Sequence, residues 1–263
     1  MSIEVNPDWW KTLFDDVYLT TDARSVCNDD LTRREVDVFC ELVPFRKTDR
    51  ILDLCGGHGR HSLELCRRGF ACCTVFDYSD KLLERGRQGA SEKHYAVSFV
   101  QGDARGTGLA DGSFDRVMIL GNSLGYVPDV EADLQILIEG FRLLTPDGWL
   151  LLDLTDGRQV KAHFSPNAWH EIEPNVVVCR QREIKEDMIC AREMVLSKDT
   201  GIIRDKAYCV RLYEPDAITA LVRRAGYRDV HVHLGFRPHR GKGDFGFMNQ
   251  RMLVTARKRQ AHL

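Results

Sequence analysis

One short stretch constrains the fold of this chain more than any other. Residues 50–60 read RILDLCGGHGR, an apolar run that carries Asp53 and then breaks into glycines. A helical pattern follows and ends before Gly69. This order predicts a strand, a tight turn and a helix, because glycine takes positive φ cheaply and lets a backbone pass close to a ligand. Backbone N–H groups at the start of that helix and the carboxylate of Asp53 would then face one ligand.

The spacing of the glycines narrows the class of ligand. A dinucleotide fingerprint needs G-x-G-x-x-G, but Ser62 stands where the third glycine would be. A G-x-x-x-x-G-K-[ST] phosphate loop is also missing from the sequence. Residues 53–59 instead resemble motif I of the class I S-adenosylmethionine-dependent methyltransferases, whose usual form is acidic-x-G-x-G-x-G, with Cys55 in the first glycine position. A glycine-rich turn that holds no ligand is the structural alternative.

Two later carboxylates follow apolar runs in the same way. Asp77 comes directly after the β-prone run 71–76, and Asp103 follows the next apolar run. A carboxylate at the carboxyl end of the second strand of a doubly wound sheet can accept hydrogen bonds from ribose hydroxyls. Asp77 could instead cap the next helix, a role that is also open to Ser79 or Asp80.

The elements after Asp103 complete the family pattern. We expect a strand at 116–120, a loop at 121–126, a helix at 131–144, a turn at 145–148 and a strand at 149–154. Motifs in this order between residues 50 and 155 resemble the methyltransferase family. The resemblance implies an α/β fold with a doubly wound, mostly parallel seven-stranded sheet. Its C-terminal antiparallel hairpin would pair residues 229–234 with 251–257.

Additional segments precede and follow this core. Apolar side chains recur at helical spacing in 7–20 and 29–45, and residues 170–185, 188–197 and 202–212 alternate as strands do. The expected division is an N-terminal helical lid at 1–45, a cofactor-binding α/β core at 46–157, a small antiparallel β insertion at 158–212 and the end of the α/β core at 213–263. The resemblance implies that the insertion covers the substrate or pairs two subunits into a homodimer.

The resemblance also implies S-adenosylmethionine as the cofactor and gives roles to residues at the strand ends. The methionine portion would contact Asp53, Cys55, Gly56, Gly57 and Gly59. The rest of the cofactor would contact Asp77 and Tyr78 at the ribose, Asp103 and Ala104 at the adenine, and Gly121 and Asn122 after the fourth strand. The methyl-transfer site would be lined by the catalytic candidates Asn122, Tyr126 and Tyr18, with Ser123, His58 and Tyr213 as further candidates.

Methyl transfer from a sulfonium is an SN2 displacement whose leaving group is already activated. The protein mainly aligns the nucleophile, the methyl group and the sulfur, and shields them from water. A base is needed only where the nucleophile must lose a proton early. Residues 121–126 lack the Asn/Asp-Pro-Pro-Tyr motif of many family members that methylate nucleic acids and proteins. We therefore expect transfer to an N, O or S atom of a small-molecule acceptor.

Charge and cysteine content argue against several other classes of protein. The 37 Lys and Arg residues nearly balance 39 Asp and Glu residues, which disfavours a dedicated nucleic-acid or membrane-surface protein. No apolar run is long enough to span a bilayer, and the N-terminus does not resemble a signal peptide. The nine cysteines are scattered without a C-x-x-C pair, which predicts free, mostly buried thiols in a reducing cytoplasm.

Two other functions stay open at this point. Gly121, Ser123 and Gly125 match the G-x-S-x-G pattern of an α/β serine hydrolase, and six histidines follow Ser123 in the chain. A hydrolase would, however, leave the carboxylates after the first three strands without a role. A non-catalytic cofactor-binding module would keep those carboxylates and show no turnover.

Two further features of the sequence are a candidate metal site and a candidate substrate-contacting loop. His231 and His233 share one face of a predicted strand and could suit a metal, but no third ligand stands at a suitable spacing. We therefore expect no metal. The basic, glycine-rich segment 235–247 fits either a plain hairpin loop or a loop that contacts an anionic group of the substrate.

Overall fold

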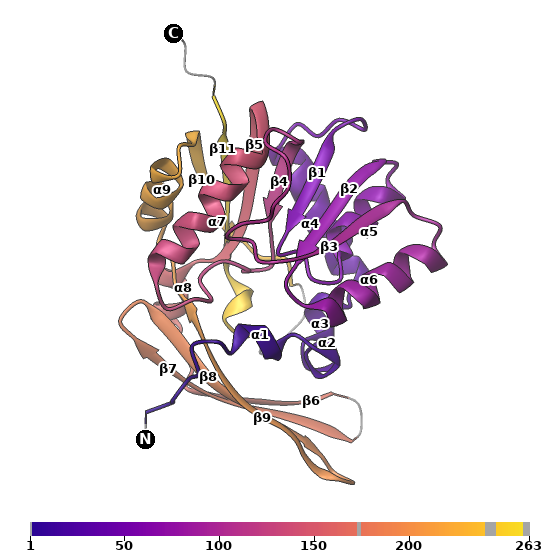
Figure 1. The fold of residues 1–263 in the computed structure, drawn as a ribbon. Coiled ribbons are helices and arrows are strands. Elements are labelled where there is room, and N and C mark those ends of the chain that lie inside the picture. The colour runs from indigo at the N-terminus through magenta and orange to yellow at the C-terminus, as the bar shows by residue number, and fades with distance from the viewer. Residues whose placement is uncertain (1, 173–174, 240–245, 260–263) are drawn as a thin grey trace.

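A computed structural model describes residues 2–172, 175–239 and 246–259 of the chain (Figure 1). The described residues form one seven-stranded sheet, in the order β10-β11-β5-β4-β1-β2-β3, and one four-stranded sheet, in the order β6-β7-β8-β9. The predicted segment 235–247 falls partly outside the described residues, so its role as a substrate loop stays a prediction.

The seven-stranded sheet confirms the predicted fold class. Its strands are β1 (Arg50–Leu54), β2 (Cys72–Asp77), β3 (Val97–Gln101), β4 (Phe114–Ile119), β5 (Leu144–Thr155), β10 (Arg228–Phe236) and β11 (Arg251–Arg257). The strands β1 to β5 pair in parallel, whereas β11 is antiparallel to both β5 and β10. The expected C-terminal hairpin is therefore present, and the carboxyl ends of the parallel strands meet at one edge of the sheet.

Helices cover both faces of this sheet. They are α4 (Asp29–Leu42), α5 (Arg60–Arg67), α6 (Asp80–Glu92), α7 (Val130–Leu143) and α9 (Pro215–Arg224). Consecutive residues of a strand point to opposite faces. Leu52 of β1 packs in one core cluster with Leu137 of α7 and Ile218 of α9, while Ile51 packs in a second cluster with Phe39 of α4. The near-continuous apolar strands of the sequence are explained by this burial on two sides.

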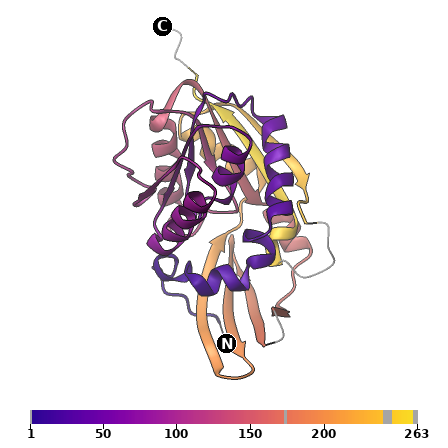
Figure 2. The same cartoon turned by 90° about the vertical axis from the view of Figure 1, so that its right-hand side faces the viewer.

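The N-terminal segment differs from the single helix expected at residues 7–20. It forms three short helices, α1 (Trp10–Leu13), α2 (Asp16–Thr21) and α3 (Ala23–Val26). The chain breaks after α1 because Asp15 leaves the helical conformation and accepts hydrogen bonds from the N–H groups of Val17 and Tyr18, which starts α2. We call residues 9–27 the strap. Figures 1 and 2 show the strap between the seven-stranded sheet and the four-stranded sheet.

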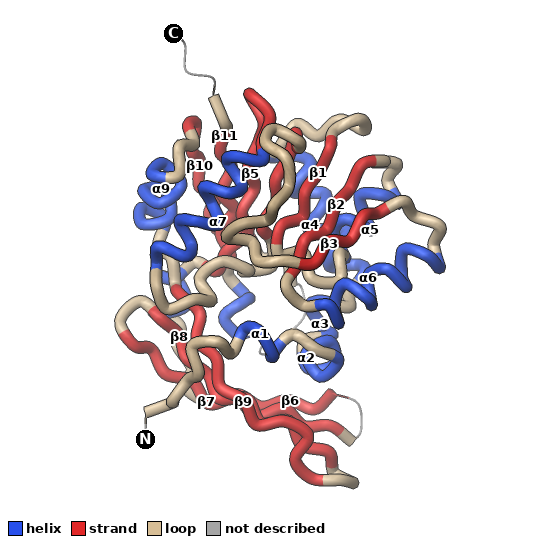
Figure 3. The backbone as a smooth tube through the Cα atoms, viewed as in Figure 1, coloured by secondary structure: helices blue, strands red, loops and turns tan. Residues whose placement is uncertain are grey.

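The β insertion has one strand more than predicted. Its strands are β6 (Asn167–Ile172), β7 (Val176–Lys185), β8 (Met188–Ser197) and β9 (Gly201–Arg211), preceded by the unpredicted helix α8 (Gly157–Ala162). The single strand expected at 170–185 is wrong, because β6 pairs antiparallel with β7 and places His170 opposite Val178. Figure 3 shows this sheet as a separate layer beneath the strap.

The expectation of free, mostly buried thiols is also wrong. Cys190 and Cys209 lie opposite each other on β8 and β9, with 4.0 Å between their Cα atoms, and form a disulfide. Of the seven free cysteines only Cys73 is buried. The pairing of β8 with β9 brings the two disulfide cysteines together, and no spacing in the sequence marks it.

Candidate functional site

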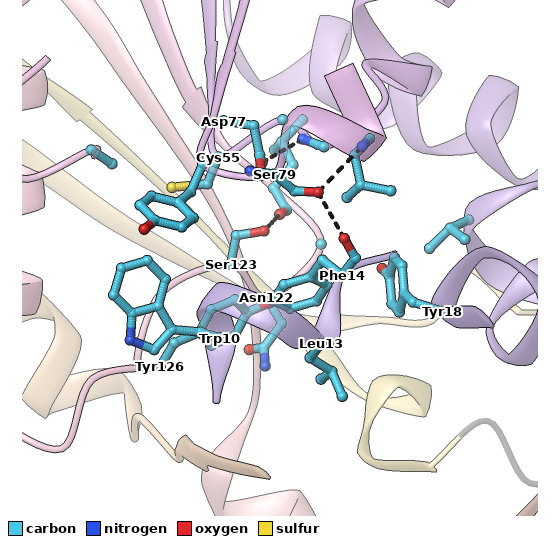
Figure 4. A pocket seen from close by; sticks show the side chains of 18 of the residues that line it. Trp10, Leu13, Phe14, Tyr18, Cys55, Asp77, Ser79, Asn122, Ser123 and Tyr126 are labelled. Carbon is cyan, nitrogen blue, oxygen red and sulfur yellow. Dashed lines mark hydrogen bonds between the residues drawn. The ribbon is translucent and has the colours of Figure 1, made fainter. Parts of the chain in front are cut away.

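A cavity of about 240 Å³ lies where the parallel strands end. Its lining comes mainly from the loops after β1 to β4, the strap, and strands β8 and β9 of the four-stranded sheet, with smaller contributions from helices such as α7 and from Met248 and Arg251. Ligands of open α/β sheets bind outside the carboxyl ends of the strands. The strap and the second sheet add walls to this edge, and the pocket stays partly open. Figure 4 shows side chains of the strap, such as Phe14 and Tyr18, in the lining.

The turn after β1 brings two carboxylates to the cavity. Gly57 has φ +58°, and its N–H donates to Oδ2 of Asp77 at 2.7 Å. A Cβ at Gly56 would stand 2.7 Å from Cγ of Asp53, so only glycine fits there. Asp53 is buried; its Oδ2 accepts from Ser62 at 3.0 Å, and its Oδ1 has no partner within the described residues. Burial raises the pKa of the Asp53 carboxyl to about 7.

The strand ends at Asp77 and Asp103 differ in their electrostatics. Asp77 accepts hydrogen bonds from the N–H groups of Gly57 and Ser79, and burial raises the pKa of its carboxyl. It does not cap the next helix, because Ser79 caps α6 by accepting from the N–H of Leu82 at 3.2 Å. Asp103 is half-buried, and its hydrogen bonds with Arg105 lower its pKa.

The loop after β4 is fixed by hydrogen bonds to the end of β5. Gly121 and Asn122 both have positive φ, of +66° and +62°. The N–H of Gly121 donates to Oδ2 of Asp153 at 3.0 Å, and Oδ1 of the buried Asn122 accepts from the N–H of Thr155 at 2.9 Å. Tyr126 then stacks on Phe14 of the strap, with ring centroids 5.4 Å apart. The loop is therefore fixed both to the end of β5 and to the strap.

A buried ion network supports this loop. Arg251 pairs with Asp153, with 3.1 Å between Nε and Oδ1, and also with Glu35 of α4. Glu35 also pairs with Arg60, and its Oε2 lies at hydrogen-bonding distance, 3.0 Å, from Nε2 of His61. These charges compensate one another, as buried charges must. The sequence offered two overlooked signals: Glu35 interrupts the apolar face of its helix, and Arg251 opens an otherwise apolar strand.

The strap is tied to both sheets. Ser79 donates from Oγ to the carbonyl of Phe14 at 2.7 Å, which links the strap to the start of α6 (Figure 4). On the other side, Arg204 of β9 pairs with Asp15, and Arg180 of β7 pairs with Asp22 at 3.1 Å. The strap therefore closes the cavity without being part of either sheet.

Most predicted site residues lie in the cavity lining. These are Tyr18, Asp53, Cys55, Gly56, Gly57, His58, Asp77, Tyr78, Asp103, Ala104, Gly121, Asn122, Ser123 and Tyr126. Gly59 is not among the lining residues: its φ is +73°, and a Cβ there would stand 2.8 Å from Cγ2 of Val75, so it serves the packing of α5 on the sheet. Tyr213 is also outside the lining and donates its hydroxyl to Asp133 at 2.6 Å.

The prediction expected the N-terminal segment and the insertion to cover the site, but Tyr18 was the one residue of these segments that it named as a main site candidate. Trp10 of the strap lies edge-on to Tyr78, with 4.8 Å between ring centroids. Glu193, Arg204 and Tyr208 come from β8 and β9. The alternation of β8 and β9 was visible in the sequence, but which face meets the cavity depends on how the two sheets pack.

The geometry around Ser123 does not favour a hydrolase. Its Oγ donates to the carbonyl of Leu120 at 2.7 Å. A nucleophile elbow places the serine at a sharp turn directly before a helix, whereas α7 begins only at Val130. The possible metal pair is also not supported, because His233 bonds Thr255 at 3.1 Å and no group of three ligand side chains suited to a metal ion occurs among the residues that the structure describes.

The family model and the curated relatives that match this chain are methyltransferases. Residues 51–148 match a family model described as a methyltransferase domain. The demethylmenaquinone methyltransferase of Beutenbergia cavernae is 32% identical over 165 residues, which are 61% of this chain and 60% of that protein. The glycine/sarcosine N-methyltransferase of Halorhodospira halochloris is 29% identical over 126 residues, 48% of this chain and 47% of that protein. The chain therefore spans between about half and three fifths of the length of these curated relatives.

Solved structures match a larger share of the chain than the curated relatives do. The CcbJ methyltransferase of Streptomyces caelestis superposes with a TM-score of 0.75 at 18% identity, covering 97% of this chain and 100% of that one. An S-adenosylmethionine-dependent methyltransferase of Clostridium acetobutylicum gives a TM-score of 0.72 at 13% identity, covering 93% and 97%. At these identities the likeness shows that the fold is shared, including the region outside the family match.

Proposed function

We propose that this chain, which carries a class I, Rossmann-like methyltransferase domain, transfers a methyl group from S-adenosylmethionine to a small molecule. The observation that carries the proposal is the convergence of Asp53, Asp77 and Asp103 on one cavity beside the backbone of Gly57. A nucleoside ligand with a cationic amino-acid tail needs carboxylates at these separate places, which a hydrolase would not use.

The residues of the cavity fit this cofactor. The unpartnered Oδ1 of Asp53 is a buried acceptor that the amino group of the methionine portion would satisfy. Asp77 would accept from the ribose hydroxyls, and Asp103 with Ala104 would meet the adenine. The lack of a side chain at Gly56 and Gly57 leaves room for a ligand beside the turn. When bound, S-adenosylmethionine supplies a methyl group on a good leaving group.

The remaining residues would position the acceptor and exclude water. Asn122, Tyr126 and Tyr18 would line the site of transfer, because the loop after β4 and the strap meet there. Holding the acceptor atom in line with the methyl–sulfur bond is the main contribution that a protein makes to such a displacement. The strap would act as a lid, and the four-stranded sheet would cover the substrate.

A small-molecule acceptor with a reactive N, O or S atom is the proposed substrate class. The names of the relatives support a small-molecule acceptor, since they include a glycine/sarcosine N-methyltransferase and a sugar N-methyltransferase. Others are named C-methyltransferases of ubiquinone and menaquinone biosynthesis, so the proposed acceptor atom does not rest on these names. The balanced charge of the chain also argues against a dedicated nucleic-acid-binding protein. No described helix has the length and apolar character needed to cross a membrane. A cytoplasmic location and a homodimer through the four-stranded sheet are further parts of the proposal.

Calorimetric titration of the purified chain with S-adenosylmethionine and S-adenosylhomocysteine tests the cofactor. We expect Asp77→Ala to weaken binding at least about tenfold, because two or more hydrogen bonds to a charged acceptor are lost. Asp80→Ala is the matched control, since Asp80 is an exposed carboxylate three residues away. Absence of binding to either ligand in the wild type would refute the proposal. Binding without turnover on any acceptor would indicate a non-catalytic module.

A further inference from the structure

Five aromatic rings of the cavity lining contact one another, and we call them the aromatic wall. They are Trp9, Phe14 and Tyr18 of the strap, Tyr126 of the loop after β4, and Tyr208 of β9. Phe14 is 5.0 Å from Tyr18 and 5.4 Å from Tyr126, and Trp9 is 5.1 Å from Tyr126 and 5.6 Å from Tyr208, measured between ring centroids. Aromatic faces attract a cation, most strongly where water is excluded. This wall therefore suits a positive charge better than an anion.

The charged groups of the lining are close to balance. Six carboxylates and four guanidinium groups line the cavity: Asp22, Asp53, Asp77, Asp103, Asp133 and Glu193, and Arg60, Arg105, Arg204 and Arg251. Arg180 and Arg211, outside the lining, pair with three of these carboxylates. The histidines add no charge at neutral pH, because burial lowers the pKa of both His58 and His61 to about 4. No surplus of positive charge therefore repels a cationic ligand from the aromatic wall.

Near the aromatic wall, the groups that could remove a proton are already engaged. Asp133 accepts from Gly125, Arg211 and Tyr213. Glu193 pairs with Arg180 and Arg204. Both oxygens of each carboxylate are held by cations or donors. Neither carboxylate therefore offers a free acceptor to a hydroxyl.

The remaining candidates are engaged or lie on other elements. Asp53 and His58 belong to the turn after β1, where Oδ1 of Asp53 is assigned to the amino group of the cofactor and the ring of His58 bonds the backbone of Val26. Asp22 pairs with Arg180 and also accepts from Thr21. The ring of His61 is bound to Glu35, and burial raises the pKa of the phenols Tyr18 and Tyr126, which keeps both as neutral donors. An alcohol has to lose its proton to a base during attack, whereas a neutral amine attacks through its lone pair and loses a proton afterwards.

We infer that the acceptor is an amine, bound as the neutral base against the wall of Trp9, Phe14, Tyr18, Tyr126 and Tyr208; this inference rests on the proposed methyl transfer. The nitrogen lone pair forms the new N–C bond while the C–S bond breaks and its electron pair stays on sulfur, which becomes a neutral thioether. The positive charge thus passes from sulfur to nitrogen, and the resulting ammonium then releases a proton to water. The aromatic wall would stabilise the charge as it arrives on nitrogen.

A pair of probes of the same shape tests the wall without turnover. Choline carries a quaternary ammonium, and 3,3-dimethylbutan-1-ol has a neutral carbon in its place. In calorimetry with saturating S-adenosylhomocysteine we expect choline to bind about tenfold more tightly than the alcohol, in line with a desolvated cation–π contact. Phe14→Leu and Tyr126→Leu should each reduce this ratio severalfold. Phe45→Leu is the matched control, because Phe45 packs on Phe70 in the core cluster that also contains Phe39.

A turnover assay completes the test. Benzylamine, benzyl alcohol and benzyl mercaptan share one skeleton, and release of S-adenosylhomocysteine reports transfer to each. We expect turnover of the amine above the alcohol. Equal binding of the two shape-matched probes, or no binding of either, would overturn the amine inference, as would faster turnover of the alcohol. Failure of S-adenosylhomocysteine itself to bind would instead refute the proposed function, so the two failures are distinguishable.

Discussion

At Ser79 a single hydroxyl joins the nucleotide side of the cavity to the strap. It caps α6, and it donates to the carbonyl of Phe14. Ser79→Gly would remove the donor while glycine remains a tolerable N-cap, and Ser79→Thr would keep both functions. We expect the glycine variant to bind S-adenosylhomocysteine about fivefold more weakly, since one hydrogen bond contributes ~1 kcal/mol.

Calorimetry and limited proteolysis of the strap would measure both effects of the Ser79 variants. The threonine variant should match the wild type in ligand affinity and in resistance of residues 9–27 to cleavage. Equal behaviour of the glycine and threonine variants would mean that the contact with Phe14 does not hold the strap over the ligand.

Asp53 should make the stability of the protein depend on pH. Its carboxyl has a pKa of about 7 in the folded protein against 3.8 for the ordinary group, because it is buried. Between these values the folded state binds more protons than the unfolded state, so the contribution of this group to stability falls as pH rises and is constant above about pH 7. From pH 5 to pH 8 the wild type should lose roughly 2–3 kcal/mol relative to Asp53→Asn.

Denaturant unfolding of the wild type and Asp53→Asn at both pH values measures this difference. Ser91→Ala, an exposed change on α6, serves as a control that should follow the wild type. Parallel pH profiles for the wild type and Asp53→Asn would show that Asp53 is ionised throughout and that its buried oxygen is compensated in solution.

The site carboxylates could be predicted because each follows an apolar strand in the chain. Predicting Asp53, Asp77 and Asp103 required only the local order of strand and turn in the sequence. The network of Glu35, Arg60 and Arg251 could not be found in this way. Its members lie far apart in the sequence, and only the packing of α4 and β11 on the end of β5 brings them into contact.

Among the elements, the turn into α5 shows that one glycine-rich motif can contain two kinds of glycine. Gly57 faces the cavity, whereas Gly59 faces the sheet. Gly59→Ala would force a Cβ with positive φ to within 2.8 Å of Val75 and 3.1 Å of Phe99. We expect a loss of roughly 2–4 kcal/mol in the free energy of unfolding, from backbone strain and overpacking together.

Gly69→Ala is the matched control for this loss. Gly69 also has positive φ, at +88°, but a Cβ there would meet nothing within 4 Å. Chemical denaturation should show a smaller loss of about 1 kcal/mol for this variant, from backbone strain alone. Equal losses at the two positions would mean that α5 shifts to accept the extra carbon and that its packing on β2 and β3 is not tight.

Element boundaries were predictable where periodicity was long and turns were marked by glycine. Strands β1 to β4 and α7 appear within a few residues of their expected places, whereas β5 already begins at Leu144 and includes the segment 145–148 that was expected to be a turn. The strap was not predictable as three short helices, because Asp15 stops one helix and starts the next inside a continuous apolar pattern. The reversal of the chain between β6 and β7 was missed although the sequence marks it: Glu173, Pro174 and Asn175 interrupt the alternation of side chains, and Pro and Asn favour turns.

The whole molecule places its cavity between parts that are distant in the chain. The α/β core supplies most of the carboxylates, the strap supplies four aromatic side chains, and the four-stranded sheet supplies the floor. Pairs such as Arg204 with Asp15 and Arg180 with Asp22 hold the strap against the second sheet. Cofactor binding on one side of the strap and acceptor binding on the other would therefore be expected to stabilise the same closed arrangement.

The outer face of the four-stranded sheet is the surface on which a second copy of the chain would pack. Trp169 is 69% exposed on the edge strand β6, and it lies beside Cys179 and Met194 in register across β7 and β8. Cross-strand neighbours share one face, so these side chains form an apolar row that faces away from the strap. In the proposed homodimer this row would be covered, and Trp169 would be its most exposed contact.

Sedimentation velocity should therefore detect a dimer of the wild-type chain at micromolar concentration. Trp169→Glu would place a charge at the exposed end of the apolar row and should shift the protein to monomer, with at least about a tenfold rise in the dimer dissociation constant. Ile138→Glu is the matched control, because Ile138 is 47% exposed on α7, away from this sheet. A wild-type monomer, or a dimer that responds equally to both substitutions, would remove the four-stranded sheet as the interface and leave it with the single role of covering the cavity.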